Sequence, residues 1–542
     1  MYRSLGFMFA LLAVCRAEAE PVPGGLLRVC LRSEPRTFHP LHADEGASQT
    51  IRYLTAGVLL KVDRVAQVYM PSLAASWKVG RDGRSIHFKL REGMRFSDGT
   101  PFEAADVAYT IGLLADPALH NGTVDAFRGS GGPPKAVVTS ALSVSVAFPQ
   151  PMAGVERLFD GLAILSARSP LKERAVLGPF RTKEYKPGQY VLLERNPHYW
   201  ERDEQGRKLP YLDGVRLEIQ GNRELEAERF RSGAIHLINR VDPEIFSRLQ
   251  SELPTWTHNA GPSLEGEQMW FNQAPNSPIA PAKKLWFQSV AFRRAISGAI
   301  QREDLSRLVF RNLAEPAAGP ISPANRFWYN DRLRPHAYDQ AGALVRLEKD
   351  GFRLAGKTLL DRAGNRVEFS LITNAGNRAR ERMAVMIQHD LEKIGIRVHV
   401  VTLEFPSLIE RLTKSFDYDA CLLGLVNVDL DPNSQLNVWL SSASSHQWNP
   451  NQTTPATKWE AEIDRLMRAQ AAALDPLKRK VFFDQVQQIV WEQAPFLYLV
   501  NKRVLTAIHP QLRNARVAQI DPYAYWRFER LYLSATGGGS VQ

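Results

Sequence analysis

The sequence predicts an α/β protein with more than one lobe, and three observations lead to this prediction. Its 542 residues are too many for a single module at about 150 residues per domain. Hydrophobic residues make up 44% and charged residues 23%, a balance that allows large buried cores. In the second half, a strand pattern at 369–372, a helical stripe of Met383, Ile387 and Leu391, and alternation over 396–400 form a βαβ unit.

The first 19 residues have the pattern of a secretory signal peptide. A short basic start precedes an uncharged apolar run over 4–15, and small residues form an A-x-A cleavage site at 17–19. The run is too short to span a bilayer, so we expect residues 1–19 to direct export and to be removed. The four residues ending at Cys15 also resemble a lipoprotein box, in which Cys15 would be acylated, and both outcomes stay open.

Elements of both kinds follow along the chain. A strand is predicted at 26–31, a polar loop at 32–46 and a helix at 47–60. Polar residues after the first strand of an α/β lobe often meet a ligand, so Asp44 and Glu45 are candidate binding residues. Their alternative role is that of charges at a helix N-terminus.

Alternating apolar residues and Asp-Gly turns predict a β-hairpin between 72 and 101, followed by a helix opened by Pro101. Two amphipathic helices are predicted at 459–467 and 482–490, with their apolar stripes in the core.

Charge and cysteine content exclude two classes of protein. With 68 Lys and Arg against 57 Asp and Glu, the net charge is +11, a sign that suits nucleic acid or an anionic surface. The basic residues are mixed with acidic ones, however, so nucleic-acid binding is not expected. Three cysteines cannot build a disulfide scaffold, and Cys30 and Cys421 lie in apolar strand-like runs, where we expect buried thiols.

A series of motifs carries a family resemblance. Between 73 and 107 the chain contains LAASW, DG, FKLREG, FSDGTPF and ADV, and GPF, NPHYW and LPYLD follow over 178–213. FN at 271–272 precedes FRRAI at 292–296, which runs on to IQRE at 300–303. Together these blocks resemble the signature of the family 5 bacterial extracellular solute-binding proteins, the peptide- and nickel-type receptors of ABC importers. The resemblance covers roughly residues 26–530.

The resemblance implies a fold, a two-lobed clamshell of the periplasmic-binding-protein kind (type II-like) with an additional third domain. By analogy, the chain divides into lobe I (26–62, 172–265 and 495–533), domain II (63–171) and lobe III (266–494). The two crossings between lobes I and III, near Gly266 and Pro495, would form the hinge.

The resemblance also implies a function. We expect a periplasmic, monomeric receptor that captures a small-molecule or peptide ligand in the interlobe cleft and delivers it to an inner-membrane ABC permease. A receptor for nickel, a metallophore or another non-peptide solute is the alternative within the same fold. No enzyme motif of the H-E-x-x-H, G-x-S-x-G or C-x-x-C kind occurs, and no cofactor or metal is expected. His39 and His42, the closest histidine pair, are interpreted as surface residues unless nickel is the ligand.

The strongest candidate binding segment follows an apolar strand at 420–425. Asn427, Asp429 and Asp431 come directly after it, which places polar side chains at the strand's carboxyl end facing the cleft. In the family this segment contributes ligand contacts, and peptide-binding relatives often carry a Trp and an Asp where this chain has Leu425 and Val428. Asp429 or Asp431 would then pair with a cationic ligand group, although Asp431 before a proline also suits a turn.

Four further residues complete the candidate site. Trp439 and Trp448 would supply aromatic walls, with core packing as the alternative for Trp439 and polar neighbours indicating partial exposure of Trp448. Asn374 and Asn377 precede a helix, where capping is the alternative role.

One motif is interpreted as a coincidence. Gly351 to Thr358 match the G-x-x-x-x-G-K-[ST] phosphate loop. That loop requires a strand before it and a helix after it, whereas here a helix at 341–349 precedes and a strand follows. We therefore expect no ATP binding.

Overall fold

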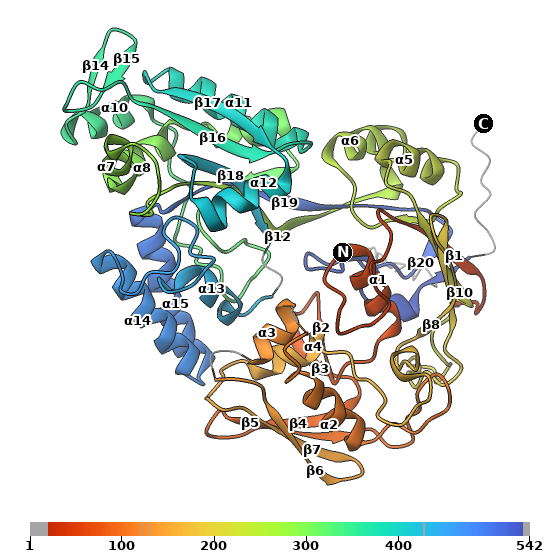
Figure 1. The fold of residues 1–542 in the computed structure, drawn as a ribbon. Helices are drawn as coiled ribbons and strands as arrows, with labels where there is room; N and C mark the ends of the chain where they lie inside the picture. Colours follow the sequence, from red (N-terminus) through yellow and green to blue (C-terminus); the bar gives the residue numbers. More distant parts are fainter. Residues whose placement is uncertain (1–19, 120, 129–130, 427–428, 535–542) are drawn as a thin grey trace, which may run out of the picture.

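The computed structural model describes residues 20–119, 121–128, 131–426 and 429–534 (Figure 1). The predicted signal peptide with Cys15, and the candidate ligand residue Asn427, lie outside these described residues. Within the described ranges, no helix has both the length and the apolar character needed to cross a membrane.

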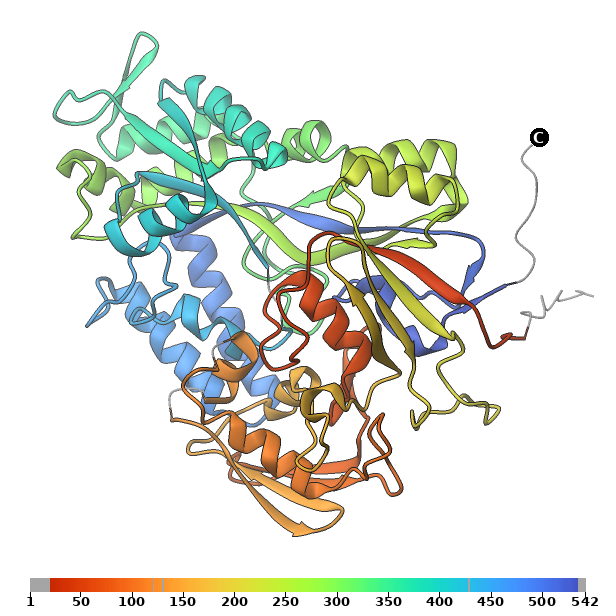
Figure 2. The same ribbon diagram turned by 45° about the vertical axis from the view of Figure 1, so that its right-hand side comes forward.

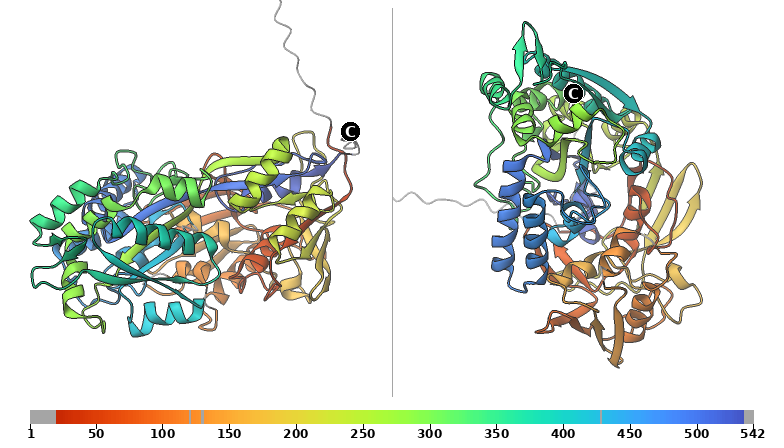
Figure 3. Two further views of the ribbon diagram at one scale, coloured as in Figure 1. Left: turned by 90° about the horizontal axis from the view of Figure 1, so that it is seen from above. Right: turned by 60° about the vertical axis from the view of Figure 1, so that its left-hand side comes forward.

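An eleven-stranded mixed sheet runs through the molecule. Its strands in spatial order are β17 (Arg397–Leu403), β16 (Glu368–Asn374), β18 (Ala420–Val426), β12 (Thr257–Phe271), β19 (Phe496–Ile508), β11 (Leu237–Ile238), β1 (Leu26–Leu31), β10 (Gly214–Ile219), β9 (Tyr190–Arg195) and β8 (Phe180–Lys186), with β13 (Ala314–Pro316) paired to β19 off this path. The long antiparallel strands β12 and β19 join the two ends of the sheet (Figure 2). Seen from above, the molecule extends along these two strands (Figure 3).

Helices cover both faces of the β16–β18–β12–β19 region, because successive residues of a strand point to opposite faces. On one face Met269 and Phe271 pack with α7 (Pro281–Gln288), α8 (Val290–Ala299), α10 (Gln340–Lys349) and α11 (Arg378–Glu392). On the other face Trp270 packs with α12 (Phe405–Glu410), α13 (Leu436–Trp439), α14 (Lys458–Ala472) and α15 (Pro476–Gln493). The last two helices lie side by side (Figure 3).

The other end of the sheet and a separate small sheet form the rest of the molecule. Around β1 and β10 lie α1 (Gly46–Thr55), α5 (Arg223–Arg231) and α6 (Pro243–Glu252) (Figure 1). The small antiparallel sheet has the order β4 (Ala74–Val79), β5 (Ser85–Leu90), β7 (Ser143–Ala147) and β6 (Lys135–Ser140). It shares its own core with α2 (Ala104–Leu113), α3 (Gly122–Arg128), α4 (Leu158–Gly161) and the hairpin β2 (Leu60–Asp63) and β3 (Val68–Pro71).

We keep the names lobe I, domain II and lobe III for these three parts, with limits that stay a prediction. One crossing lies close to Gly266, which faces Asn501 at a place where the β12–β19 register shifts. Pro495 lies just before β19, and the next residues of that strand, Leu497, Leu499 and Val500, belong to the lobe III core. The second crossing, expected near Pro495, stays a prediction.

Several predicted elements are confirmed. β4 and β5 pair as the expected hairpin, β16–α11–β17 is a parallel βαβ unit, and Cys30 and Cys421 are buried within strands. The phosphate-loop motif, Gly351 to Thr358, follows α10 and contains β14 (Arg353–Ala355) and the turn of its hairpin with β15 (Thr358–Leu360), so a helix precedes it and a strand follows, as expected.

Two predicted helix limits are wrong. The first helix ends at Thr55 instead of Leu60, because Leu59 and Leu60 leave it to pack into the core of domain II. The next helix begins at Ala104 and not at Pro101, since the Asp106 carboxylate accepts a hydrogen bond from the Glu103 backbone N–H at 2.8 Å and fixes the start there.

Candidate functional site

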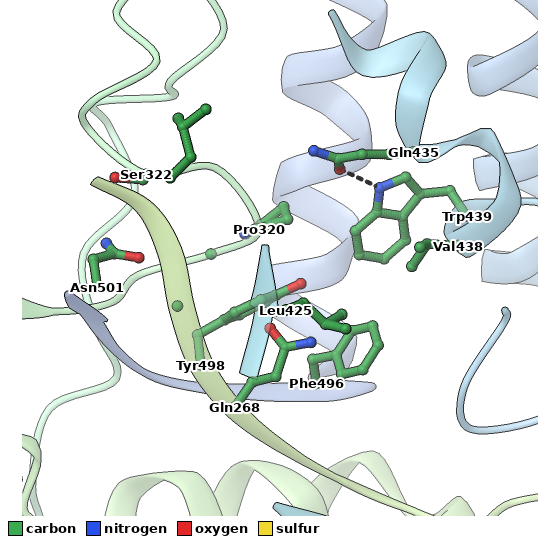
Figure 4. Close-up of a pocket in the computed structure, with 13 residues that line it drawn as sticks. Gln268, Pro320, Ser322, Leu425, Gln435, Val438, Trp439, Phe496, Tyr498 and Asn501 are labelled. Atoms are coloured by element: carbon green, nitrogen blue, oxygen red, sulfur yellow. Dashed lines mark hydrogen bonds between the residues drawn. The ribbon is translucent and has the colours of Figure 1, made fainter. Parts of the chain in front are cut away.

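A cavity lies where β12 and β19 cross between the lobes, and Figure 4 shows its walls. Its volume, measured as the space open to the centres of water-sized molecules, is about 40 Å³, and it is partly open to solvent. The lining residues come from β12, the loop after β13, β18, the 3₁₀ turn η6 (Pro432–Gln435), α13 and β19, and they are Leu264, Gly266, Gln268, Gly319, Pro320, Ser322, Leu425, Gln435, Val438, Trp439, Phe496, Tyr498 and Asn501.

The floor of the cavity is made by paired residues of the two crossing strands. Gln268 on β12 is the register partner of Tyr498 on β19, and Phe496 lies two residues before Tyr498 on the same face. The Gln268 amide and the Tyr498 hydroxyl extend toward the space bounded by Pro320 and Trp439 (Figure 4). Burial raises the pKa of Tyr498 well above its ordinary value, so this hydroxyl keeps its proton and can donate.

An aromatic and amide wall stands opposite this floor. The Trp439 Nε1–H donates to Gln435 Oε1 at 2.8 Å, which fixes the orientation of both side chains (Figure 4). The Trp439 ring centroid lies 6.1 Å from that of Phe496 in an edge-to-face arrangement. Among the described residues, none that lines the cavity carries a charge.

Charged residues lie just outside the cavity in a belt along β12. The carboxylate of Glu267 is 1% exposed and accepts hydrogen bonds from Arg380 Nε at 2.8 Å and Lys502 Nζ at 2.6 Å. Burial alone would raise the pKa of Glu267, but the two cations outweigh it and hold the pKa below the ordinary value. Gly424 makes this geometry possible, because a Cβ at that position would lie 2.3 Å from the Arg380 guanidinium.

Glu265, two residues earlier, is also paired. Its carboxylate accepts from Arg240 at 2.9 Å and from the Tyr523 hydroxyl at 3.0 Å. Lys502 lies 4.0 Å from Glu265 and so bridges both carboxylates of the belt.

Two of the predicted acidic ligand residues are engaged in ion pairs within the chain. Asp429 accepts from Arg157 of domain II at 2.8 Å. Asp431 caps η6 and forms two hydrogen bonds with Arg479 of α15, at 2.6 and 2.7 Å. Their role in ligand binding stays a prediction, and the observed contacts hold the loop after β18 against domain II and α15.

The other polar candidates lie at helix starts. Glu45 caps α1 by accepting from the backbone N–H groups of Ala47 and Ser48, and Asp44 beside it is exposed. Asn377 caps α11, and Asn374 accepts from Arg380 Nη1 at 2.8 Å, which places it next to the charged residues along β12. In the described part of the chain, only Trp439 of the nine predicted residues lines the cavity.

The predicted partial exposure of Trp448 is wrong, because its side chain is fully buried. Its polar neighbours point inward to the buried carboxylate of Glu460. Trp448 Nε1 donates to Glu460 at 3.0 Å, and His446, Gln452 and Thr457 lie within hydrogen-bond distance of the same carboxylate. Burial alone would raise the pKa of Glu460, but these hydrogen bonds lower it to about 2.

Comparison with known proteins decides the family of the chain. A model of the bacterial extracellular solute-binding proteins, family 5 Middle, matches residues 68–447. The chain belongs to this family. A probable ABC transporter-binding protein of Deinococcus radiodurans is 25% identical over 525 residues, which cover 89% of this chain and 87% of the relative. The oligopeptide-binding protein AppA of Bacillus subtilis is 26% identical over 551 residues, which cover 95% of this chain and 92% of the relative.

Solved structures show the fold of this family 5 protein. AppA of Bacillus subtilis in complex with a nonapeptide superposes with a TM-score of 0.73 at 23% identity, covering 95% of this chain and all of AppA. NikA of Brucella suis in complex with Fe(III)-EDTA superposes with a TM-score of 0.79 at 20% identity, covering 94% of this chain and all of NikA. The predicted α/β clamshell with a third domain is confirmed.

Several cavity residues of this family 5 protein were missed from the sequence: Gln268, Gln435, Phe496, Tyr498 and Asn501. One signal was available, since Gln268 is an amide immediately before the buried run Met269 to Phe271. Tyr498 and Phe496 gave none, because buried strands are rich in aromatic residues whether or not they meet a ligand.

The side chains of His39 and His42 contact each other. The His39 and His42 rings have centroids 4.7 Å apart in the loop before α1, and His42 is exposed. No group of three or more His, Cys, Asp or Glu side chains suited to a metal ion occurs in the described ranges.

Proposed function

We propose that this protein is the substrate-binding component of an ABC importer. It captures a peptide or peptide-like solute between its lobes and delivers it to an inner-membrane permease without changing it chemically. The observation that carries the proposal is the cavity at the β12–β19 crossing, where aromatic rings and amides converge at the junction of two lobes. The name of the relative AppA, an oligopeptide-binding protein, supports a peptide as the solute class.

The site of action follows from the N-terminal pattern and the family. Residues 1–19 act as the signal for export, and the mature chain works in the periplasm, with a lipid anchor at Cys15 if the lipoprotein box is used. The protein acts as a monomer without ATP, cofactor or covalent chemistry, and the free energy of binding comes from desolvation and lobe closure.

Contacts between domain II and lobe III support closure as the working motion. Arg157 of domain II pairs with Asp429, and Asn433 Nδ2 donates to the Ala153 carbonyl at 2.9 Å. Gln67 donates to the Ala324 carbonyl in the same way. A solute favours this closed arrangement only by the difference between its affinities for the closed and open states.

The test combines ligand identification with scattering. The protein is purified from its native host without refolding, and mass spectrometry identifies any trapped solute. Small-angle scattering then measures the radius of gyration of solute-free protein with and without that solute or a defined peptide mixture. We expect a peptide-dependent contraction in the wild type that is weakened in Trp439→Ala and retained in Trp491→Ala, which lies outside the cavity.

Three outcomes would contradict the proposal. An equally open molecule under every tightly bound solute would exclude capture by closure. A chemically altered solute would indicate an enzyme. Saturable quenching of tryptophan fluorescence by nickel, with no response to peptides, would support the nickel or metallophore receptor instead.

A further inference from the structure

Domain II and lobe III touch each other at two places, although each has a hydrophobic core of its own. In the described ranges, the core of domain II contains no residue of lobe III, and the lobe III core around Trp270 contains none of domain II. The first contact involves the turn between α14 and α15, and the second involves the turn of the β2–β3 hairpin (Figure 1). Because no apolar core spans these contacts, domain II can leave lobe III without exposing one.

The first contact is made by the residues that precede the 3₁₀ turn η1 (Val155–Arg157) of domain II. Both backbone groups of Ala153 are hydrogen-bonded to lobe III. Its N–H donates to the Ala471 carbonyl of α14 at 3.4 Å, and its carbonyl accepts from Asn433 Nδ2 at 2.9 Å. A backbone segment held on both sides fixes where domain II stands relative to α14 and η6.

Gly154 makes a close approach to lobe III in this first contact. Its φ of +62° lies in the left-handed region, and a Cβ at this position would stand 2.5 Å from Asp431 Oδ2 and 3.2 Å from Arg479 Nη1. Asp431 and Arg479 are joined to each other within lobe III by two hydrogen bonds, so the pair forms a fixed platform. A side chain at position 154 would therefore force domain II and this platform apart.

The second contact is made by the side chain of Gln67 in the β2–β3 turn. Its amide is used twice, since Nε2 donates to the Ala324 carbonyl and Oε1 accepts from the Arg326 backbone N–H at 3.2 Å. The Arg326 guanidinium in turn donates to the Val65 carbonyl of the same turn. The amide can form both of its hydrogen bonds only when the turn lies directly against residues 324–326.

The residues that make these two contacts are separate from the cavity. None of them is among its lining residues in the described part of the chain. Asp431 and Asn433 nevertheless lie at the start of η6, and the last residue of that turn, Gln435, lines the cavity. Domain II thus holds the segment that forms one wall of the cavity without entering the cavity itself.

We propose that Gly154 and Gln67 are positioning residues for solute capture, which hold domain II against lobe III so that this contact supplies part of the free energy of lobe closure without touching the solute. The proposal rests on the proposed function, since it assumes capture by closure, and it adds which residues outside the cavity set the balance between the open and closed states. A weaker contact lowers the closed fraction of the solute-free protein, and the apparent dissociation constant of a solute rises by the same factor.

Electron paramagnetic resonance measures the distance between the two parts directly. Spin labels are attached through Val137→Cys on β6 and Gln485→Cys on α15, both exposed positions, in the mature chain, whose own Cys30 and Cys421 are buried. In the solute-free wild type we expect a fraction of molecules at a short distance between the labels. Gly154→Ala should lower that fraction about threefold.

Two further variants make the test specific. Gly93→Ala is the matched control, because Gly93 also lies in domain II at a positive φ, +73°, and a Cβ there would have nothing within 4 Å. It introduces the same backbone strain without the collision and should keep the wild-type distances. Gln67→Glu keeps the size of the side chain, but its carboxylate cannot donate to the Ala324 carbonyl, so it should also lower the short-distance fraction. It serves as the test if Gly154→Ala does not fold.

A titration measures the effect on affinity. An equimolar mixture of alanine tri-, tetra- and pentapeptides is added, and the short-distance fraction is followed. The concentration at half of the change should be about threefold higher for Gly154→Ala than for the wild type, and unchanged for Gly93→Ala. At saturation Gly154→Ala should regain the short distance, which a variant with a damaged fold would not do.

Different failures have different meanings. If Gly154→Ala and Gln67→Glu keep the wild-type distances, or if Gly93→Ala changes them as much as Gly154→Ala, the positioning proposal is overturned and the receptor function stands. If the variants open the molecule and the peptide titration is unchanged, the contact contributes nothing to capture, and the proposal is also overturned. If the wild type responds to no peptide, the assignment of a peptide solute falls, while the distances in the solute-free variants still decide whether these residues hold domain II.

Discussion

The loop after β18 and the floor formed by β12 and β19 use polar side chains in opposite ways. In the loop, Asp429 and Asp431 are ion-paired with Arg157 and Arg479 and tie lobe III to domain II and α15. In the floor, the Gln268 amide faces the cavity. The difference teaches that in this protein the charged residues of the loop hold the backbone in place, whereas neutral residues line the cavity.

The two tryptophans of the candidate site are both buried in the lobe III core and differ in their hydrogen-bond partners. Trp439 donates to a neutral amide, Gln435, and lines the cavity. Trp448, with its ring centroid 6.2 Å away, donates to the charged Glu460 and is fully buried. A polar partner that is neutral can stand at a cavity wall, whereas the buried charge requires a complete set of donors around it.

The largest expected effect comes from breaking the loop's buried ion pair. Arg479→Met keeps the length of the side chain but leaves Asp431 without its cation, so the free energy of unfolding should fall by about 3–5 kcal/mol. Urea titration at neutral pH measures the change. Arg465→Met removes an exposed pair with Glu462 on α14 and is the control, with no measurable loss expected. Equal losses in both variants would show that burial does not set the strength of these pairs.

The next effect is a pH dependence centred on Glu460. Its pKa is about 2 in the folded protein against an ordinary 4.5, since its donors outweigh the effect of burial. A lowered carboxyl pKa stabilises the fold above the ordinary value, here by roughly 3 kcal/mol, and this contribution is lost as the pH falls from about 5 to 2. Glu460→Gln should lower the free energy of unfolding at neutral pH. It should also make the decrease in stability between about pH 5 and 2 (the acid limb of the stability profile) less steep.

The control for this prediction is Glu462→Gln on the exposed face of the same helix. Its side chain is 43% exposed, so the acid limb should keep its slope. Unfolding temperatures measured between pH 2 and 7 compare the variants. A Glu460→Gln profile as steep as that of the wild type would mean that other carboxylates carry the acid sensitivity.

A smaller effect is expected from the contact that joins domain II to lobe III. A double-mutant cycle with Arg157→Met and Asp429→Asn should give a coupling energy of about 1–2 kcal/mol, because the side chains are 7% and 24% exposed. Both single variants should also increase the radius of gyration of the solute-free protein. If the two losses in unfolding free energy are additive and the radius of gyration does not change, the ion pair does not hold domain II against lobe III.

The fold was largely predictable from the sequence because its signals are local. The period-two alternation of β5 and the helical stripe of α11 follow from which faces are buried, and both elements formed as predicted. Helix limits were less certain, since Leu59 and Leu60 follow the α1 pattern but pack into another domain. Their destination depends on tertiary contacts that no local window contains.

The candidate site was less predictable because its partners are remote in sequence. Asp429 was expected to pair with a cationic group of the ligand, and in the structure it pairs with Arg157, which lies 272 residues away in the sequence. The polar run around Trp448 indicated exposure, and only the position of Glu460 on α14 shows that these groups point inward. The charge and hydrogen-bonding capacity of a residue follow from its type. Whether it pairs with a ligand or with another residue of the chain depends on tertiary contacts.

The last prediction is that the phosphate-loop motif, Gly351 to Thr358, does not bind ATP. A phosphate site needs consecutive backbone N–H groups that converge at the start of a helix, but Leu354 and Ala355 instead pair with Leu359 and Thr358 in a hairpin. Lys357 is exposed at its turn. Calorimetric titration with ATP and Mg²⁺ should therefore give no saturable heat, and Lys357→Ala should match the wild type in every measurement above. Micromolar binding that is lost in Lys357→Ala would contradict this prediction. It would show that the hairpin rearranges around a phosphate and that a charged ligand binds there, outside the cavity.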